Sequence, residues 1–343
     1  MKKILFILCF CVFSTQLFSQ EKKEHPLYCV AFYNLENLFD TISGPNDKEY
    51  TPTGSKEWNT EKYYSKLKKM SYCISKIGKQ FSPMGPSILG VAEVENRSVL
   101  EDLVKQEAIK NVNYKIVHFE GPDYRGVDCA LLYNPRDFYV TNSKSYHLVM
   151  ENDTTFRTRD QLLVSGILGN DEIHIIVNHW PSRRGGELAS RPKRIAAAGL
   201  SKHISDSILA KNPDAKIVIM GDLNDDPINE SVKTVLNAKK KQKEVARGGL
   251  YNSTWELYSK GIGSLAYGDE WNLFDQIIIS SGLLDKEEKT NLRFVKAEIF
   301  QAPFLIQQEG QYKGYPLRTH AGGVYQNGYS DHFPSLIYLT KEE

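Results

Sequence analysis

Acidic and amide residues that could bind a metal ion stand at the ends of apolar, strand-like runs in this chain. A hard cation such as Mg²⁺ takes oxygen ligands and keeps several waters, so one or two carboxylates and a substrate phosphate can hold it. Glu93 and Asp331 could supply the carboxylates, and Asn34 could add an amide oxygen without adding charge. The sequence therefore predicts an oxygen-ligated Mg²⁺ site, at which Mn²⁺ or Ca²⁺ could also bind.

A second set of residues suits the hydrolysis of a phosphodiester. That reaction needs an activated water, stabilised phosphoryl oxygens and help for the leaving alkoxide. Asp222 could orient or deprotonate the water, and Asn224, on the same side of an extended segment, could donate to a phosphoryl oxygen. His179 and His332 could donate protons, and each ring needs a carboxylate to fix its tautomer. Two carboxylates in the sequence, Asp128 and Asp275, are candidates for these partners.

Strand-like apolar runs recur along the chain and must position these side chains. The runs span residues 28–33, 87–92, 127–133, 161–168, 172–178, 215–220, 274–280 and 334–339. Apolar residues spaced by three and four predict helices within 60–80, 97–107 and 190–210. Many of the runs are apolar on both strand faces, so both faces of a sheet should be covered. The pattern predicts sheets packed on each other with helices outside, in one domain over residues 25–341.

The same segments resemble the endonuclease/exonuclease/phosphatase superfamily, in the order of that family and over nearly the whole chain after its N-terminal segment. The most specific motifs are Gly221-Asp222-Leu223-Asn224 and Ser330-Asp331-His332-Phe333-Pro334. The resemblance implies an α+β fold, a four-layer αββα sandwich in which two mostly antiparallel sheets lie between helices. It also implies metal-dependent hydrolysis of phosphoric esters.

The resemblance assigns roles to the polar residues. It makes Asn34, Glu93 and Asp331 the residues of the metal site. It makes Asp222 and Asn224 the pair that orients water and binds phosphate.

The two histidines take separate partners in this resemblance. Asp275 supports His332. The deoxyribonuclease-like branch of the family has a histidine, paired with an upstream acid, where this chain has His179, and Asp128 is the expected partner. Arg159 resembles the arginine with which that branch contacts phosphate.

The segment that follows His179 departs from the better-known members of the superfamily. Its sequence, Trp180-Pro181-Ser182-Arg183-Arg184-Gly185-Gly186, resembles that of a bacterial, often exported subgroup, which also shares the opening at residues 34–39. We expect Arg183 and Arg184 to bind substrate phosphates, within a local basic strip that continues through Arg191, Lys193 and Arg194.

The overall charge limits what the protein can bind. The chain has 43 Lys and Arg residues against 42 Asp and Glu residues, a formal net charge of +1. A protein that binds nucleic acid through its general charge would have a larger excess, so such binding must be local. The leading interpretation is a nuclease that cleaves DNA or RNA. The alternatives are a phosphodiesterase or phosphatase acting on a lipid headgroup or a small phosphate ester, and a noncatalytic binding module, which would lack catalytic side chains.

The N-terminus predicts export. Met1-Lys2-Lys3 precedes an apolar run over residues 4–12, which is too short to span a bilayer and fits a cleavable signal at residues 1–19. We expect cleavage near Ser19 and a periplasmic or secreted monomer with no stable membrane insertion. Cys29, Cys73 and Cys129 would remain, with spacing that fits neither a disulfide framework nor a zinc site.

Overall fold

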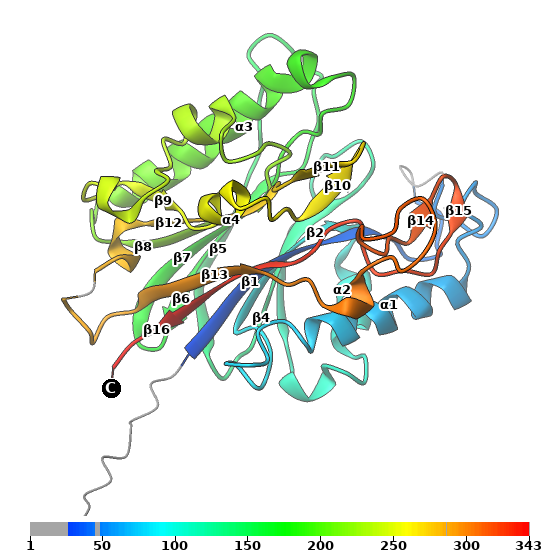
Figure 1. Ribbon diagram of the computed structural model, residues 1–343, viewed down its shortest axis with the longest axis horizontal. Coiled ribbons are helices and arrows are strands. Elements are labelled where there is room, and N and C mark those ends of the chain that lie inside the picture. Colours follow the sequence, from blue (N-terminus) through cyan, green and yellow to red (C-terminus); the bar gives the residue numbers. More distant parts are fainter. Residues whose placement is uncertain (1–26, 45–48, 286, 343) are drawn as a thin grey trace, which may run out of the picture.

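The computed structural model describes residues 27–44, 49–285 and 287–342. The predicted export signal at residues 1–19 lies outside these described residues. Two six-stranded sheets pack face to face in the centre of the molecule, with helices on their outer faces (Figure 1). No helix in the described part of the chain is long and apolar enough to cross a membrane.

The first sheet has the strand order β13-β16-β1-β2-β4-β3. Its strands are β1 (Leu27–Leu38), β2 (Ile88–Val94), β3 (Lys115–His118), β4 (Asp128–Tyr133), β13 (Arg293–Ile299) and β16 (Ser335–Thr340). Strands β1 and β2 run parallel, and the other neighbours in this sheet are antiparallel.

The second sheet has the strand order β5-β6-β7-β8-β12-β9. Its strands are β5 (Phe138–Tyr146), β6 (Gln161–Leu168), β7 (Asp171–His179), β8 (Lys216–Asp222), β9 (Leu250–Asn252) and β12 (Asp275–Ser280). Here β7 and β8 are the parallel pair, and the remaining neighbours are antiparallel. The prediction of two mostly antiparallel sheets is confirmed.

Helices cover the outer face of each sheet. The first sheet is covered by α1 (Thr60–Ile74) and α2 (Arg97–Val104), which begin at the side-chain caps Asn59 and Asn96. The second sheet is covered by α3 (Glu187–Leu209) and by a π-helical turn, Ser231–Val235. The molecule is therefore the expected four-layer sandwich. Short 3₁₀ turns occur at Lys110–Val112, Gln242–Glu244, Ser281–Leu283 and Pro303–Leu305.

The apolar core is divided by the sheets into three layers. Phe32 and Val177 belong to the layer between the sheets, Leu67 to the layer under α1, and Ile204 to the layer under α3. The sheets approach closely at Gly90, where an added Cβ would lie 2.6 Å from the Sδ of Met220. A larger residue at position 90 would force Met220 to move, so this close contact between the sheets favours glycine.

Each strand-like run of the sequence corresponds to a strand of the structure. The strands β3, β5, β9 and β13 were not predicted, and these four form the edges of the two sheets. Three of them are only partly buried and lack the continuous apolar run that marked the central strands: β3, β5 and β13 consist largely of half-buried and exposed residues. The fourth, β9, is buried but only three residues long, which is too short to give a recognisable run.

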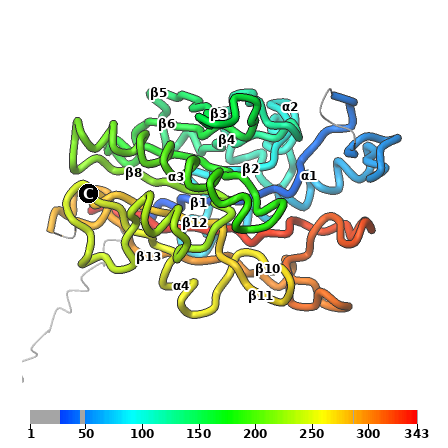
Figure 2. Tube along the Cα trace, turned by 90° about the horizontal axis from the view of Figure 1, so that it is seen from above, coloured from blue at the N-terminus to red at the C-terminus, as the bar shows by residue number. Residues whose placement is uncertain are grey.

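Two small hairpins and a short helix extend beyond the sheets. They are β10 (Leu265–Tyr267) with β11 (Glu270–Asn272), β14 (His320–Ala321) with β15 (Val324–Tyr325), and α4 (Trp255–Ser259). In Figures 1 and 2 the β10–β11 hairpin lies beside the orange and red segment that leads into β14 and β15. This places both hairpins at one end of the sandwich.

Candidate functional site

Strand ends from both sheets meet at one edge of the sandwich. The parallel strands β1 and β2 carry Asn34 and Glu93 toward this edge, and the parallel strands β7 and β8 end at His179 and Asp222. The register pairs His179 with Asp222. It also pairs Asp222 with Asp275, because β12 starts where β8 ends. The fold thus brings together residues far apart in the sequence.

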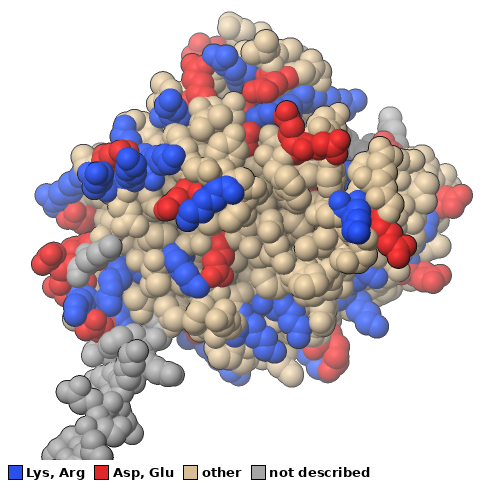
Figure 3. Space-filling view, in the orientation of Figure 1, with Lys and Arg blue, Asp and Glu red and all other residues tan. Residues whose placement is uncertain are grey.

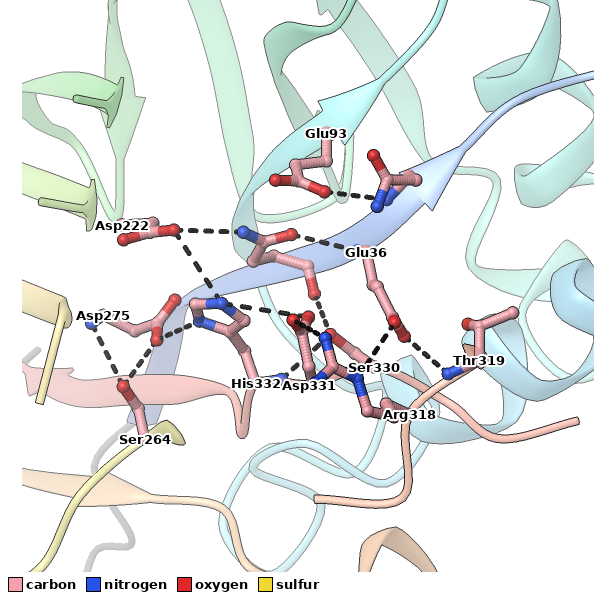
Figure 4. A network of polar contacts seen from close by, with 12 residues as sticks. Glu36, Glu93, Asp222, Ser264, Asp275, Arg318, Thr319, Ser330, Asp331 and His332 are labelled. Atoms are coloured by element: carbon pink, nitrogen blue, oxygen red, sulfur yellow. Dashed lines mark hydrogen bonds and ion pairs between the residues drawn. The ribbon is translucent and has the colours of Figure 1, made fainter. Parts of the chain in front are cut away.

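Asp222 contacts several members of the polar cluster, and Figure 4 shows its contact with His332. Its Oδ2 accepts a hydrogen bond of 3.1 Å from the Asn34 amide. The same oxygen lies 3.5 Å from the Nε2 of His179 and 3.9 Å from the Nε2 of His332. Glu93 lies 3.8 Å from His179, and Asp331 lies 3.8 Å from His332. The structure therefore gathers both histidines and all three predicted metal-site residues around one aspartate.

The backbone at this cluster is unusual. Glu36, Asn37, Glu93 and Asn224 have φ angles of 49°, 53°, 61° and 50°. Positive φ costs a non-glycine residue roughly 1 kcal/mol or more and persists only where surrounding contacts impose it. Such contacts are present: Asn37 N donates to Glu93 Oε2 at 2.9 Å, and Asn224 N donates to Asp222 Oδ1 at 3.0 Å. The backbone conformation at these residues therefore helps to direct their side chains toward the cluster.

Gly221 is required by the neighbouring strand. A Cβ at this position would overlap the carbonyl oxygen of Asn178 on β7. The glycine of the Gly221-Asp222-Leu223-Asn224 motif therefore lets β8 lie against β7 directly before the central aspartate.

His332 and Asp275 form the predicted pair. The Nδ1 of His332 lies 2.6 Å from Asp275 Oδ2, and that carboxylate also accepts a hydrogen bond from the Ser264 hydroxyl. Burial lowers the pKa of His332, but the carboxylates of Asp275 and Asp331 outweigh it and hold the pKa well above its usual value. His332 is thus favoured as an imidazolium, with its Nε2 on the side of Asp222.

The expected pairing of Asp128 with His179 is wrong. The Asp128 carboxylate accepts from Gly121 N at 3.0 Å and lies 3.1 Å from His118 Nε2. Alternation along β4 explains the error: Asp128 shares its strand face with Ala130, which packs in the layer under α1 and α2, away from the second sheet that carries His179.

His179 has its own environment. Its Nδ1 is buried and has no hydrogen-bond partner among the described residues. Burial, followed by the nearby charge of Arg159, holds the pKa of His179 well below its usual value. The ring is therefore neutral, in contrast to His332.

Arg159 is buried beside His179 but is held by other groups. Its guanidinium contacts Asp123 Oδ2 at 3.2 Å and donates to the Trp180 carbonyl, while its Nε is buried without a partner in the described chain. The structure thus places Arg159 at the cluster, with Asp123 as a partner that the sequence did not indicate.

Arg183 supports the backbone next to the site. It donates to the carbonyl of Asn224 at 3.0 Å, contacts Asp225 at 3.3 Å and lies over the ring of Phe274 at 4.6 Å. Its guanidinium also approaches Asp226, at 3.5 Å. These contacts occupy the side chain that we expected to bind a polyanion.

The expected basic strip does not form. Arg191 pairs with Glu230, and the fully buried Arg194 pairs with Asp225 at 2.7 Å. Arg184 is exposed. On the face shown in Figure 3, positive and negative side chains are interspersed. Arg194 of α3 is thus held inside the fold by a buried acid, a contact that periodicity alone could not reveal.

Two arginines beside the predicted metal-site carboxylates had no assigned role. Arg125 contacts Glu93 Oε1 at 3.0 Å and Asn37 Oδ1 at 3.2 Å. Arg318 contacts Asp331 Oδ2 at 2.8 Å (Figure 4). Arg125 stands in a polar segment just before β4, and that position was the one signal in the sequence that could have pointed to it. Nothing in the sequence indicated Arg318.

A buried ion pair lies behind the site. Lys66 on α1 is 3.8 Å from Glu36. Glu36 accepts a hydrogen bond from Thr319 N at 2.6 Å (Figure 4). Burial, followed by the charge of Asp331, raises the pKa of Glu36 to about 7. This pair ties α1 and β1 to the segment that carries Arg318.

The cluster fits a hard divalent cation. Asn34, Glu93 and Asp331 present oxygen donors. A half-exposed arginine lies beside each carboxylate, Arg125 beside Glu93 and Arg318 beside Asp331. Burial, together with the nearby carboxylates of Asp275 and Glu93, raises the pKa of Asp222 to about 7. A cation would stabilise that concentration of negative charge.

Comparison with known proteins agrees with this geometry. Residues 29–341 match the model of the Endonuclease/Exonuclease/phosphatase family. No curated protein sequence matches the chain significantly. Truncated TDP2 from Caenorhabditis elegans is 19% identical, with 92% of this chain and 97% of that chain covered and a TM-score of 0.51. The human Nocturnin catalytic domain with a bound sulfate is 17% identical, with coverages of 93% and 96% and a TM-score of 0.54.

A further similar structure is an endonuclease/exonuclease/phosphatase family protein from Bacteroides thetaiotaomicron. It is 14% identical, with 93% of this chain and 100% of that chain covered and a TM-score of 0.54. At these identities the structural likeness concerns the fold.

Proposed function

As a member of the endonuclease/exonuclease/phosphatase family, the protein is a metal-dependent phosphoric ester hydrolase, and we propose that it cleaves the phosphodiester bonds of DNA or RNA. The observation that carries the proposal is the position of Asp222, in contact with Asn34 and within 4 Å of both histidines. Acid, base and oxygen ligands stand close enough to act on one phosphate. TDP2 from D. rerio, which shares the fold, has been solved with a single-strand DNA product.

Asn34, Glu93 and Asp331 would hold the divalent cation, which we propose to be Mg²⁺. Their donors are all oxygens, as Mg²⁺ prefers. When bound, the ion stabilises negative charge on the phosphoryl oxygens and on the leaving alkoxide. Proton transfer and the orientation of the substrate are proposed to depend on side chains of the protein.

Asp222 is the proposed base. Hydrogen bonds from Asn34 Nδ2 and Asn224 N fix its carboxylate. A buried carboxylate with a pKa of about 7 can accept a proton from water near neutral pH, where general-base catalysis is most efficient. Asn224 lies beside it, and we propose that its amide donates to a phosphoryl oxygen.

The two histidines have different protonation states and therefore different proposed roles. His332, charged through its contact with Asp275, can give a proton to the leaving oxygen. His179 is neutral, so we propose that it donates a hydrogen bond to a phosphoryl oxygen while keeping its proton. Arg159 adds positive charge beside it.

The contacts of Arg183, Arg191 and Arg194 favour a short or single-stranded substrate. Without a basic strip, a long duplex gains little from nonspecific attraction to the backbone. The same observation supports a second candidate, hydrolysis of a small phosphate ester.

A substrate panel tests the proposal. The protein would be incubated with plasmid DNA, a single-stranded RNA, bis(4-nitrophenyl) phosphate and sphingomyelin, each with Mg²⁺, Mn²⁺, Ca²⁺ or a chelator. We expect cleavage of a nucleic acid with Mg²⁺, slowed by a factor on the order of 10² or more in Asp222→Asn. Turnover of sphingomyelin alone would replace the nuclease assignment by a lipid phosphodiesterase.

We also propose that the protein is exported. Support comes from the basic start at residues 1–3 and the apolar run at 4–12. Mass spectrometry of the native protein should find a new N-terminus near residue 20. An intact Met1 terminus would contradict export through a cleaved signal.

A further inference from the structure

We propose that a pocket beside the catalytic cluster is a subsite for a nucleobase of the substrate, an inference that rests on the proposed phosphodiesterase function. The pocket has a volume of about 800 Å³ and lies between the β10–β11 hairpin and the segment 307–326. This volume falls in the usual range for small-molecule sites, roughly 300–1,000 Å³. It is large enough for a nucleoside.

The pocket begins at the reacting centre. Asp331 and Arg318 form part of its wall. Asp331 is one of the proposed metal-site residues, and its Oδ1 lies 3.8 Å from the Nε2 of His332. The pocket is therefore contiguous with the cluster at which the phosphate is proposed to bind.

A row of aromatic rings leads from His332 into the pocket. Phe333, the next residue, stacks on Trp271 with ring centroids 6.0 Å apart. Trp271 meets Tyr315 at 6.1 Å, and Tyr315 meets Tyr312 at 5.8 Å. Bases stack on exposed aromatic rings, and this stacking tolerates every base.

Two tyrosines of the pocket remain open to a ligand. Tyr267, at the turn of the hairpin, is 82% exposed, and Tyr312, on the opposite wall, is 43% exposed. Both line the pocket, one from each side. A flat ring bound between the walls could contact either tyrosine.

The two walls are fixed to each other and to the catalytic pair. The Tyr315 hydroxyl donates to Asp269 Oδ1 at 2.6 Å and accepts from Asp269 N at 2.8 Å. At the base of the hairpin, Ser264 donates to Asp275 and its carbonyl accepts from Phe333 N at 2.7 Å. The subsite is thus built in advance, which lowers the entropy lost on binding.

The charges of the pocket exclude a second phosphate. Its wall carries Asp269, Glu309 and Asp331, against Arg318, which is already held by Asp331 and Glu36. A ligand group with negative charge would be repelled. Carboxylates accept hydrogen bonds from the amino groups of bases, as they do in the readout of cytosine.

Amide side chains complete the match to a base. Gln307 and Gln311 line the pocket. The Nε2 of Gln307 donates to the carbonyl of Glu309 at 3.0 Å, and its Oε1 is an acceptor that the amino group of a base could use. Amides read the donor and acceptor edges of bases, whereas a quaternary ammonium headgroup offers them no hydrogen bond.

Competitive inhibition tests this subsite. Turnover of bis(4-nitrophenyl) phosphate would be inhibited by methyl phosphate, by phosphocholine and by nucleoside 5′- and 3′-monophosphates of each base. At least one nucleotide should bind about tenfold more tightly than methyl phosphate, in line with the stacking of one base. In Tyr267→Ala and Tyr312→Ala this ratio should fall several-fold. Tyr139→Ala, at an exposed tyrosine on β5, serves as the matched control and should keep the ratio.

The outcomes separate the subsite from the proposed function. A nucleotide that binds no better than methyl phosphate, or a ratio unaffected by both tyrosine replacements, would overturn the subsite. Tighter binding of phosphocholine would assign the pocket to a cationic headgroup instead. If the enzyme does not turn over the reporter with any divalent cation, the proposed function fails, and calorimetric titration with the same nucleotides still decides whether the pocket binds bases.

Discussion

The Nε2 of His332 lies 3.9 Å from the Oδ2 of Asp222. The two side chains come from different sheets, since His332 precedes β16 and Asp222 ends β8. One is held as a cation by Asp275, and the other is a buried carboxylate whose pKa is raised to about 7. A proton donor and a proton acceptor therefore stand together, each fixed by its own neighbours.

The His332–Asp275 pair should act as a unit. Replacing His332 with Ala should lower kcat by a factor on the order of 10² or more, the scale of a positioned acid. Asp275→Asn should produce most of the same loss, because it removes the contact that charges the ring. The double variant should be little worse than either single variant. Additive losses in steady-state kinetics would mean that Asp275 acts independently of His332.

His179 and Asp128 should behave differently from each other. His179→Ala should also lower kcat by a factor on the order of 10², because the ring lies within the cluster. Asp128→Asn should leave turnover close to that of the wild type, since its carboxylate faces His118 and Gly121. Measurement of both variants on bis(4-nitrophenyl) phosphate checks the prediction. If Asp128→Asn reproduces the loss seen for His179→Ala, the corrected pairing is itself wrong.

The sequence predicted the His332–Asp275 pair correctly and the His179–Asp128 pair wrongly, and the difference has a structural reason. Asp275 starts a strand that is antiparallel to the strand ending at Asp222, so its position follows from an apolar run and a family motif. Asp128 also adjoins an apolar run, but the face on which it lies depends on a one-residue register. The resemblance identified the strand and could not identify the face.

Ion pairs between distant segments could not be predicted from the sequence for a related reason. Lys66 lies on the buried face of an amphipathic helix, where its charge is stabilised by Glu36 from β1 and by the hydroxyl oxygen of Thr319. Arg183 appeared in a basic run, yet its partners Asp225 and Asp226 adjoin it only after folding. Periodicity reveals apolar faces, whereas these ion pairs depend on how the layers are placed.

Arg183 should matter for stability more than for binding of the substrate backbone. Arg183→Ala leaves Asp225 and Asp226 short of a partner in a buried turn, which should cost about 1–3 kcal/mol of unfolding free energy. Arg184→Ala, at the exposed neighbour, should cost less than about 0.5 kcal/mol. Urea denaturation measures both values. A stable Arg183→Ala protein with a flatter salt dependence of nucleic acid cleavage would restore the role in phosphate binding.

Stability should depend on pH through His332 when no metal is bound. The folded-state pKa of His332 is raised, so the charged ring stabilises the fold fully below the unfolded pKa of roughly 6.5. That contribution is lost as the pH rises through the folded pKa. The stability advantage of the wild type over His332→Gln, measured in a chelator, should therefore shrink from slightly acidic to alkaline pH. An advantage that grows with pH would contradict a charged ring.

The most direct test of the account is the steady-state hydrolysis of bis(4-nitrophenyl) phosphate as a function of free Mg²⁺, in the wild type and in Asp222→Asn. The wild type should show saturable dependence on Mg²⁺, no turnover in excess chelator after dialysis, and full recovery when Mg²⁺ is returned. Asp222→Asn should bring kcat down by a factor on the order of 10² or more at saturating Mg²⁺, because the proposed base is lost. Full turnover of the dialysed wild type in chelator, or wild-type turnover by Asp222→Asn, would contradict a metal-dependent reaction centred on Asp222.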